Sequence, residues 1–156
     1  WLLDEVWPRV IRQQDTAELH LAGRGMPEWL SHGRWEGVQV HGEVPEAGSF
    51  MRQYGIMAVP LRSGSGMRVK IIEGMLAGRA VVSTRVGAEG IQCTHGQHLL
   101  IADEPEAMAE AILRLISNPE LRASLGRAAH QLALGEYDNH LVIRRLTAFY
   151  ELLNQG

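Results

Sequence analysis

Residues 56–84 read IMAVPLRSGSGMRVKIIEGMLAGRAVVST, and their pattern decides the fold class. The opening IMAVP is a continuous apolar run of strand length, as expected of a strand that is covered on both faces. A glycine-bearing loop follows, then a helical pattern over residues 67–77 with Gly78 placed to cap it, and then the β-rich run AVVST. This order predicts a right-handed strand–helix–strand unit in which the two strands are parallel.

The alternation of strands and helices extends over the rest of the chain. Further strands are predicted in ELHLAG, GVQVHG and HLLIA. Helical patterns cover residues 2–14, PEWLSH, PEAGSFMRQYG, residues 105–117, residues 119–135 and residues 138–153. Pro8 lies inside the first of these and predicts a kink or a restart. The chain is therefore predicted to form one α/β domain, with a parallel sheet of about five or six strands between helices.

The composition narrows the class of protein. The chain has 156 residues with a hydrophobic share of 46% and a net charge of -3, which argues against a general nucleic-acid binder. No apolar run approaches the length of a membrane helix. Cys93 is the single cysteine, so an intramolecular disulfide and a Cys-rich zinc site are excluded, and a reducing, cytoplasmic setting is expected. The chain opens without a methionine directly in a helical pattern, and we interpret it as a fragment of a longer protein.

The loop after Pro60 has the features of an anion site. Ligands of parallel α/β sheets bind beyond the carboxyl ends of the strands, and LRSGSG follows such an end. Glycines permit a positive φ and a close approach of the ligand, and the first N–H groups of the next helix carry partial positive charge. Together these suit a phosphate. A plain flexible turn is the alternative, and Lys70 lies too far into the helix for a Walker A loop.

The helix after this loop carries the charged residues Arg68, Lys70 and Glu73, and packing a helix against a core does not require them. At about 100° per residue, the apolar side chains sweep about 200°, and Glu73 lies on the remaining face. There a carboxylate can accept hydrogen bonds from the two hydroxyls of a ribose, with room beside Gly74 and Ala77. The alternative is a solvated Lys70–Glu73 pair. Arg68 falls in the apolar arc, so its guanidinium either snorkels out of the core or neutralises a diphosphate.

Residues 58–91, AVPLRSGSGMRVKIIEGMLAGRAVVSTRVGAEGI, resemble the C-terminal, donor-binding domain of retaining, nucleotide-sugar-dependent glycosyltransferases of the GT-B fold, of the glycosyl transferases group 1 type. LHLAGRG, VQVHGEVPE, YGIMAVP and NPELRASLGRAAHQLALGEYD extend the resemblance over nearly the whole chain. It implies a Rossmann-like domain over residues 1–156 that binds the nucleotide sugar. It also implies that the first strand of this domain and the whole acceptor-binding domain precede Trp1.

The resemblance assigns roles to individual positions. Glu73 matches the second glutamate of the family's E-x7-E motif, which binds the ribose hydroxyls. The first glutamate, which contacts the donor sugar, falls at Ser65, so the chain departs from the motif and resembles a subgroup with GSG-x-R-x-K before the second glutamate. Ser65 supplies only a hydroxyl to the sugar. Arg68 and Lys70 are assigned to charge stabilisation of the leaving nucleoside diphosphate.

The implied donor-binding set comes from two loops and one helix. The backbone N–H groups of Gly66, Met67 and Arg68 match the diphosphate cradle, and Gly42 and Val44 match the turn that borders the nucleobase. The full set is Gly64, Ser65, Gly66, Met67, Arg68, Glu73, Gly42 and Val44. The implied donor is a UDP- or GDP-linked sugar, transferred with retention and without a cofactor or bound metal. The isolated chain is expected to bind donor weakly and to transfer no sugar. Any membrane association is expected to come from the absent N-terminal part.

Two alternatives from other classes remain open. An epimerase of the same architecture would act on a nucleotide sugar, and a non-catalytic binding or partner module is permitted by Ser65. Other candidate residues are weaker. His95 and His98 share a glycine-bearing loop but have no cysteine or carboxylate cluster beside them, so no metal site is predicted. His41 follows a strand and is interpreted as a packing or surface residue, and Glu89 receives no role.

Overall fold

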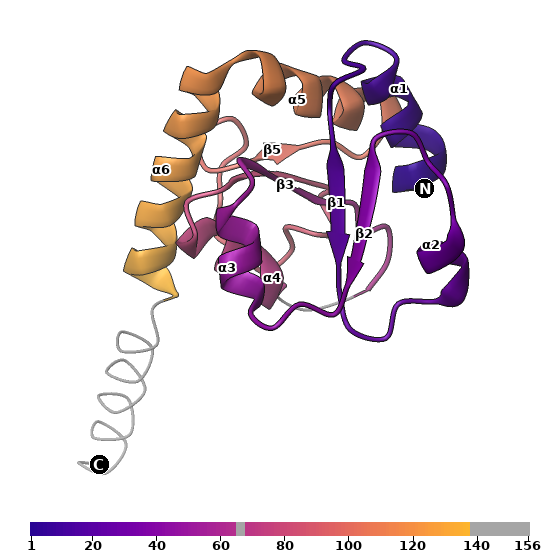
Figure 1. Cartoon of the computed structure of the whole chain (residues 1–156). Helices are drawn as coiled ribbons and strands as arrows, with labels where there is room; N and C mark the ends of the chain where they lie inside the picture. The colour runs from indigo at the N-terminus through magenta and orange to yellow at the C-terminus, as the bar shows by residue number, and fades with distance from the viewer. Residues whose placement is uncertain (65–67, 138–156) are drawn as a thin grey trace, which may run out of the picture.

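The computed structural model describes residues 1–64 and 68–137, and helices and strands alternate along them as the sequence predicts (Figure 1). The predicted helix over residues 138–153 lies outside the described residues. The elements are η1 (Leu2–Val6), α1 (Trp7–Ile11), β1 (Leu19–Ala22), α2 (Glu28–His32), β2 (Val38–Gly42), α3 (Ala47–Arg52), β3 (Ile56–Val59), α4 (Val69–Leu76), β4 (Ala80–Ser83), β5 (Leu100–Ile101), α5 (Pro105–Ser117) and α6 (Pro119–Glu136).

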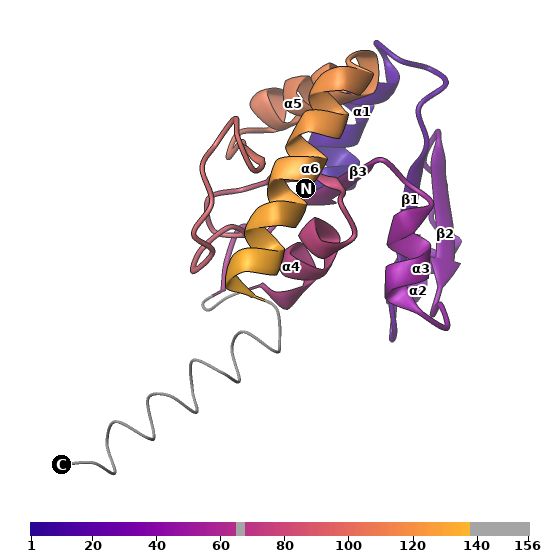
Figure 2. The same cartoon turned by 90° about the vertical axis from the view of Figure 1, so that its left-hand side faces the viewer.

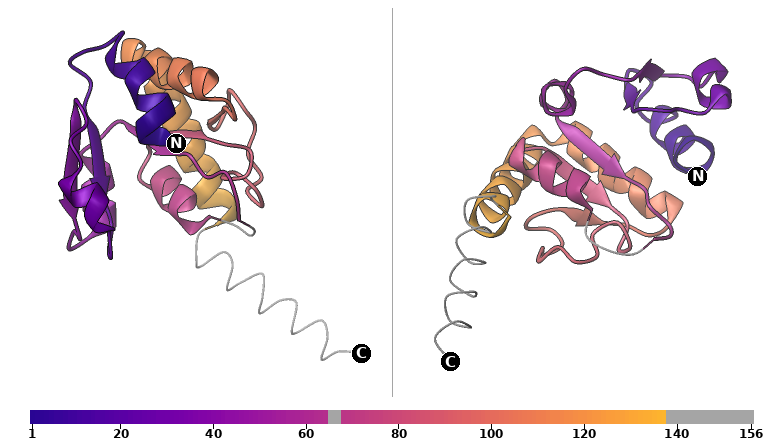
Figure 3. Two further views of the ribbon diagram at one scale, coloured as in Figure 1. Left: turned by 90° about the vertical axis from the view of Figure 1, so that its right-hand side faces the viewer. Right: turned by 90° about the horizontal axis from the view of Figure 1, so that it is seen from below.

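All strand pairs among the described residues are parallel, but they form two sheets instead of the single predicted one. β1 pairs with β2, and β3, β4 and β5 lie in that order in the second sheet. Figures 2 and 3 show the β1–β2 pair beside the second sheet and apart from it. The prediction of one continuous sheet is therefore wrong for these residues, because β1 and β3 do not pair with each other.

The second sheet is covered by helices on both faces, which confirms the predicted α/β class. Every residue of β4 is buried, because alternate side chains enter two different cores. Val82 packs in one core with residues of η1, α1 and α5, and Val81 packs in the other with residues of α4 and α6. A continuous apolar run such as AVVS is typical of a strand in this position.

Proline and glycine set several element boundaries. η1 is a π-helix of five residues, and α1 restarts at Trp7 with Pro8 in its first turn, which confirms the predicted restart. Gly78 follows the C-cap of α4 with a φ of 69°, as predicted for that position. Gly126 brings α6 against the turn after α4, where a Cβ would collide with the Gly78 carbonyl oxygen.

Candidate functional site

The loops after β3 and β4 are tied together at the carboxyl end of the second sheet. Thr84 is almost fully buried, and its hydroxyl donates a hydrogen bond to the carbonyl oxygen of Leu61. The hydroxyl oxygen of Thr84 in turn accepts a hydrogen bond from the N–H of Gly87, 3.0 Å away. The start of the glycine-bearing loop is therefore fixed over the sheet edge, which the sequence does not reveal.

Arg68 lies inside the glycine-bearing loop. Gly64 has a φ of 122°, a conformation that favours glycine, and a Cβ there would collide with the Arg68 guanidinium. Nε and Nη2 of Arg68 are buried and have no hydrogen-bond partner among the described residues. The sequence left two positions open for the Arg68 guanidinium. The structure favours the one in which it is held inside the loop over the one in which it extends to solvent.

Helix α4 begins beside this guanidinium. Arg68 is its N-cap, and the Arg68 carbonyl accepts from the N–H of Ile71 at 2.9 Å. The N–H groups of Val69 and Lys70 precede that of Ile71 in the first turn of the helix and donate to no carbonyl of the described residues. The helix therefore directs partial positive charge at the loop. The predicted site residues Ser65, Gly66 and Met67 lie outside the described residues.

Lys70 and Glu73 form an ion pair on the exposed side of α4. Lys70 Nζ lies 2.7 Å from Glu73 Oε2, and the two side chains are 65% and 38% exposed. This is the solvated pair that was one alternative for these residues. The Oε1 atom of Glu73 has no recorded hydrogen bond to a described residue, so one carboxylate oxygen stays available as an acceptor.

The expected space beside Glu73 is absent at Gly74. This glycine is buried, and a Cβ on it would collide with the sulfur of Met57 on β3. Gly74 therefore lets α4 approach the sheet and leaves no room for a ligand. The helical projection placed Gly74 on the face away from the apolar arc, but the neighbouring strand lies closer to that face than the projection indicates.

Gly42 and Val44 lie at the carboxyl end of the first sheet. Gly42 has a φ of 68°, its carbonyl accepts from the N–H of Gly23 at 2.8 Å, and nothing lies within 4 Å of the place of its absent Cβ. Val44 is half-buried and lines a cavity of about 650 Å³. Arg24 and Glu43, on the two loops of this end, approach to 3.7 Å and are both exposed.

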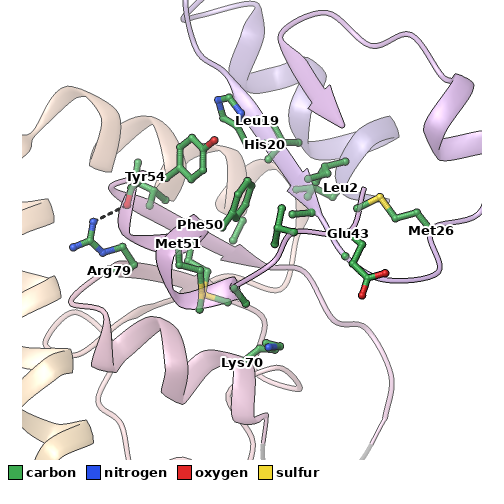
Figure 4. A pocket seen from close by; sticks show the side chains of 18 of the residues that line it. Leu2, Leu19, His20, Met26, Glu43, Phe50, Met51, Tyr54, Lys70 and Arg79 are labelled. Carbon is green, nitrogen blue, oxygen red and sulfur yellow. Dashed lines mark hydrogen bonds between the residues drawn. The ribbon is translucent and has the colours of Figure 1, made fainter. Parts of the chain in front are cut away.

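This cavity lies between β1 and β3, and it brings only part of the predicted site together (Figure 4). Val44 and Lys70 line it, whereas Gly42, Gly64, Arg68 and Glu73 do not. The other walls come from aromatic and apolar residues that sequence reasoning missed, chiefly Leu19, His20, Phe50, Met51, Tyr54 and Ile56. The one signal for them was the spacing of Phe50 and Tyr54, four residues apart around the end of α3.

Three rings that line the cavity, those of His20, Phe50 and Tyr54, form one cluster with the ring of His41, which does not line it. His20 Nδ1 lies 2.9 Å from His41 Nε2, and the His20 ring stacks on Tyr54 with centroids 4.2 Å apart. His41 and Phe50 meet edge to face at 5.2 Å. His20 Nε2 also lies 3.3 Å from a carboxylate oxygen of Glu18. His41 is thus a packing residue, as interpreted.

His95 and His98 stabilise their own loop. The Nδ1 atoms of His95 and His98 accept hydrogen bonds from the N–H groups of Ile101 and Thr94, at 2.9 and 3.0 Å. Over residues 1–64 and 68–137, no three His, Cys, Asp or Glu side chains gather as they would around a metal ion. Cys93 in the same loop is half-buried, and burial raises the pKa of its thiol.

A second cavity, of about 820 Å³, lies at the opposite, amino end of β3 and β4 and is lined by several cations. Two of its arginines and a histidine already contact backbone carbonyls, whereas Arg127 is exposed. Arg79 donates to the carbonyl of Tyr54 at 2.8 Å, Arg122 donates to that of Leu115 at 2.8 Å, and His130 Nδ1 lies 2.7 Å from that of Leu76. Among the described residues, the buried cation without such partners is therefore at the carboxyl end.

Comparison with known proteins finds relatives that are described as glycosyltransferases. The model of the family described as "Glycosyl transferases group 1" matches residues 1–118. A phosphatidyl-myo-inositol mannosyltransferase of Mycobacterium leprae is 30% identical over 96% of this chain and 41% of its own length. An uncharacterized glycosyltransferase of Methanocaldococcus jannaschii is 41% identical over 52% of this chain and 23% of its own. The chain thus spans at most about two fifths of these relatives.

A solved structure supports the fold at lower identity. Anabaena HepE, in complex with UDP and glucose, matches with a TM-score of 0.79 and 16% identity, over 94% of this chain and 43% of that one. Among the helices of the described residues, none has the length and apolar character needed to cross a membrane.

Proposed function

The chain belongs to the glycosyl transferases group 1 family, and on this premise we propose that residues 1–156 bind the nucleoside-diphosphate sugar donor of a glycosyltransferase. The proposed reaction transfers a hexose to an acceptor with retention of the anomeric configuration. The acceptor-binding domain is proposed to precede Trp1 in the same polypeptide, which is proposed to be cytoplasmic. This division agrees with the two fifths of the Mycobacterium leprae relative that the chain spans.

The observation that carries the proposal is the unpartnered guanidinium of Arg68. Two of its nitrogens are buried without an acceptor among the described residues. A buried donor without a partner costs about 1–3 kcal/mol, and more when it is charged. A diphosphate bound against the 61–64 loop would supply the missing acceptors and neutralise the charge. The first turn of α4 adds N–H groups and partial positive charge beside the same place.

The cations have a chemical role in the proposed reaction. As the bond between the anomeric carbon and the diphosphate oxygen breaks, negative charge accumulates on the departing nucleoside diphosphate. Preorganised donors that meet this charge lower the barrier. We assign this role to Arg68 and Lys70, with the backbone N–H groups of Gly66 and Met67 completing the diphosphate cradle. No step is assigned to a metal or cofactor.

Glu73 is proposed to hold the ribose. Its Oε2 atom is bonded to Lys70, and its Oε1 atom is free among the described residues to accept from a ribose hydroxyl. The ion pair connects the carboxylate to Lys70, which lines the 650 Å³ cavity. Gly42 and Val44 border the proposed place of the nucleobase, and Ser65 takes the position of the sugar contact.

The donor is proposed to be a UDP- or GDP-linked sugar. Anabaena HepE was solved with UDP, which supports UDP as the first ligand to test. The name of the Mycobacterium leprae relative supports a hexosyl group. The family match and the curated relatives give no support to either alternative function.

The proposal is tested by calorimetric titration of UDP and GDP into the full-length protein and into residues 1–156. Binding is expected, weaker for the isolated chain. The control variant Arg114→Ala removes an exposed arginine of α5 and should leave the affinity unchanged. Incubation of the full-length enzyme with donor and acceptor, followed by NMR of the anomeric proton, then distinguishes retention from inversion. Absence of binding to either nucleotide by the full-length protein would refute the proposal.

A further inference from the structure

The cavity of about 820 Å³ at the amino end of β3 and β4 has a basic wall. Its volume lies within the usual range of small-molecule sites. Its basic side chains are Arg79, Arg122, Arg127 and His130, and no Asp or Glu is found among the described residues that line it. A concave surface with one sign of charge attracts and concentrates ions of the opposite sign. The cavity therefore favours an anion.

Two of the guanidinium groups are brought to neighbouring residues of one turn, just before β3. Arg79 Nη1 donates to the carbonyl oxygen of Tyr54 at 2.8 Å. Arg122 lies against the next residue, since a Cβ placed on Gly55 would approach its Nε to 3.0 Å. Like charges that are held near each other repel, and a bound anion removes this cost.

The contacts of these arginines hold the side chains in place without compensating their charge. Arg79 Nε donates to the carbonyl of Ala77 and Arg122 Nη1 to that of Leu115, both at 2.8 Å. A carbonyl group has no net charge. The ion pairs recorded among the described residues join other arginines to carboxylates, and none of them includes Arg79, Arg122 or Arg127.

The same guanidinium groups keep N–H groups that can bind a ligand. Nη2 of Arg79 and both Nε and Nη2 of Arg122 have no recorded acceptor among the described residues. They are not buried, because the buried side-chain nitrogens without a partner in the described part of the chain belong to Arg68. Arg127 is exposed. The paired N–H groups of an arginine match the oxygens of a phosphate in geometry and charge.

We propose that this cavity, between the end of α4 and the first turns of α6, binds the phosphate monoester group of a small soluble molecule (Figure 2). Such a group carries about −1.5 to −2 charge at pH 7 and three strong acceptor oxygens, which suits three arginines better than the single charge of a carboxylate does. The site lies at the opposite end of the second sheet from Arg68. The inference is therefore independent of the proposed donor site.

A lipid headgroup can present the same phosphate monoester, but the surroundings of the cavity favour a soluble molecule. A protein surface that rests on a membrane places apolar side chains among the lipids beside the headgroup site. The large apolar side chains that are exposed among the described residues are Trp29, Val69 and Leu134, and none of them lines this cavity.

Titration of glycerol 3-phosphate into the full-length protein, followed by NMR of the glycine amides, locates the binding. Three glycines line the cavity, so shifts are expected at Gly55, Gly78 and Gly126. Gly42 and Gly64, at the carboxyl ends of the two sheets, should not shift. Glycerol, which lacks the phosphate, should shift none of the five. Absence of shifts at the three cavity glycines, or shifts confined to Gly42 and Gly64, would overturn the proposal.

Charge-removing variants test the arginines. Arg122→Gln and Arg127→Gln should each raise the Kd for glycerol 3-phosphate by about 10-fold, because each removes a charge-assisted hydrogen bond. Arg127 is exposed, so its variant should fold even if Arg122→Gln does not. The matched control Arg114→Gln removes an exposed arginine of α5 outside the cavity and should leave the Kd unchanged. An unchanged Kd in Arg127→Gln and in folded Arg122→Gln would overturn the proposal.

Two further measurements separate this site from the other possibilities. The Kd for UDP should be the same in Arg127→Gln as in the wild type, and a failure of UDP to bind would refute the donor site while leaving this one in place. Sedimentation with phosphatidylcholine vesicles that contain phosphatidic acid should not differ between the wild type and Arg127→Gln. Vesicle binding that is lost in Arg127→Gln would overturn the assignment to a soluble molecule.

Discussion

Replacement of Arg68 by methionine should raise the stability of the protein while it weakens nucleotide binding. Methionine keeps the unbranched apolar stem of the side chain and removes the guanidinium with its charge. In the absence of ligand, Nε and Nη2 of Arg68 are buried and have no partner among the described residues, so the native side chain costs free energy where it lies. A residue that stabilised the fold through its charge would give the opposite sign.

The magnitude follows from the two unpaired nitrogens. Each buried, unpaired donor costs about 1–3 kcal/mol. Because the residue is only half-buried, we take about 1–2 kcal/mol for the pair. For a chain of this length, that gain corresponds to a rise in Tm of about 2–8 °C. Loss of a charge-assisted hydrogen bond to the diphosphate, about 1.5–3 kcal/mol, should raise the Kd for UDP by about 10- to 150-fold.

Thermal denaturation with and without UDP measures both effects on one sample. Arg114→Met is the matched control, because it removes an exposed arginine from α5 and should change neither Tm nor Kd appreciably. The reasoning would be refuted by an Arg68→Met protein that unfolds at a lower temperature than the wild type and binds UDP equally well. Arg68 would then be a structural residue.

Two further predictions concern α6 and α3. Gly126→Ala should lower the free energy of unfolding by about 1–3 kcal/mol in chemical denaturation, because the new Cβ would collide with the Gly78 carbonyl oxygen. Gly135→Ala is the control on the same helix, and it should raise the free energy of unfolding by about 0.5–1 kcal/mol because its Cβ would meet no other atom. Equal effects of the two substitutions would contradict the packing of α6. The Ser49 hydroxyl and the Arg52 guanidinium lower the pKa of Glu46, so its contribution is present above the unfolded pKa of about 4.3 and is lost as the pH falls through the folded pKa. Glu46→Gln should therefore lower Tm at pH 7 but not at pH 2, and an equal decrease at both would contradict this linkage.

The local elements were predictable because the signals for them are local. Apolar runs such as IMAV and AVVS identify strands, and Gly78 and Pro119 mark helix ends whatever the rest of the chain does. The restart at Trp7 follows in the same way from the missing N–H of Pro8.

The arrangement of the strands was not predictable in the same way. Pairing of β1 with β2, and of β3 with β4, requires contacts between neighbours in the chain. Whether the two pairs meet depends on contacts between elements that are far apart in the chain, and in the described residues the two pairs form separate sheets. A pattern of alternating elements does not specify such contacts.

The candidate site was predicted in part. Charge order and helical spacing identified Lys70 and Glu73 as a pair, and the structure forms it at 2.7 Å. The projection failed at Gly74, since the distance from α4 to Met57 is a tertiary property. The aromatic wall of the cavity was missed for the same reason, because His20 and Tyr54 lie on elements 34 residues apart and meet only when the chain folds.

The central claim is that this chain holds a nucleoside diphosphate whose ribose lies on Glu73, and the most direct measurement compares two ligands on two proteins. The Kd values for UDP and for 2′,3′-dideoxy-UDP are measured by calorimetry with the full-length wild type and its Glu73→Gln variant. If the ribose hydroxyls donate hydrogen bonds to the Glu73 carboxylate, Glu73→Gln should raise the Kd for UDP by about 10- to 150-fold. The Kd for the dideoxy analogue, which lacks these hydroxyls, should be nearly unchanged. An equal effect on both ligands, or an effect on neither, would contradict the account.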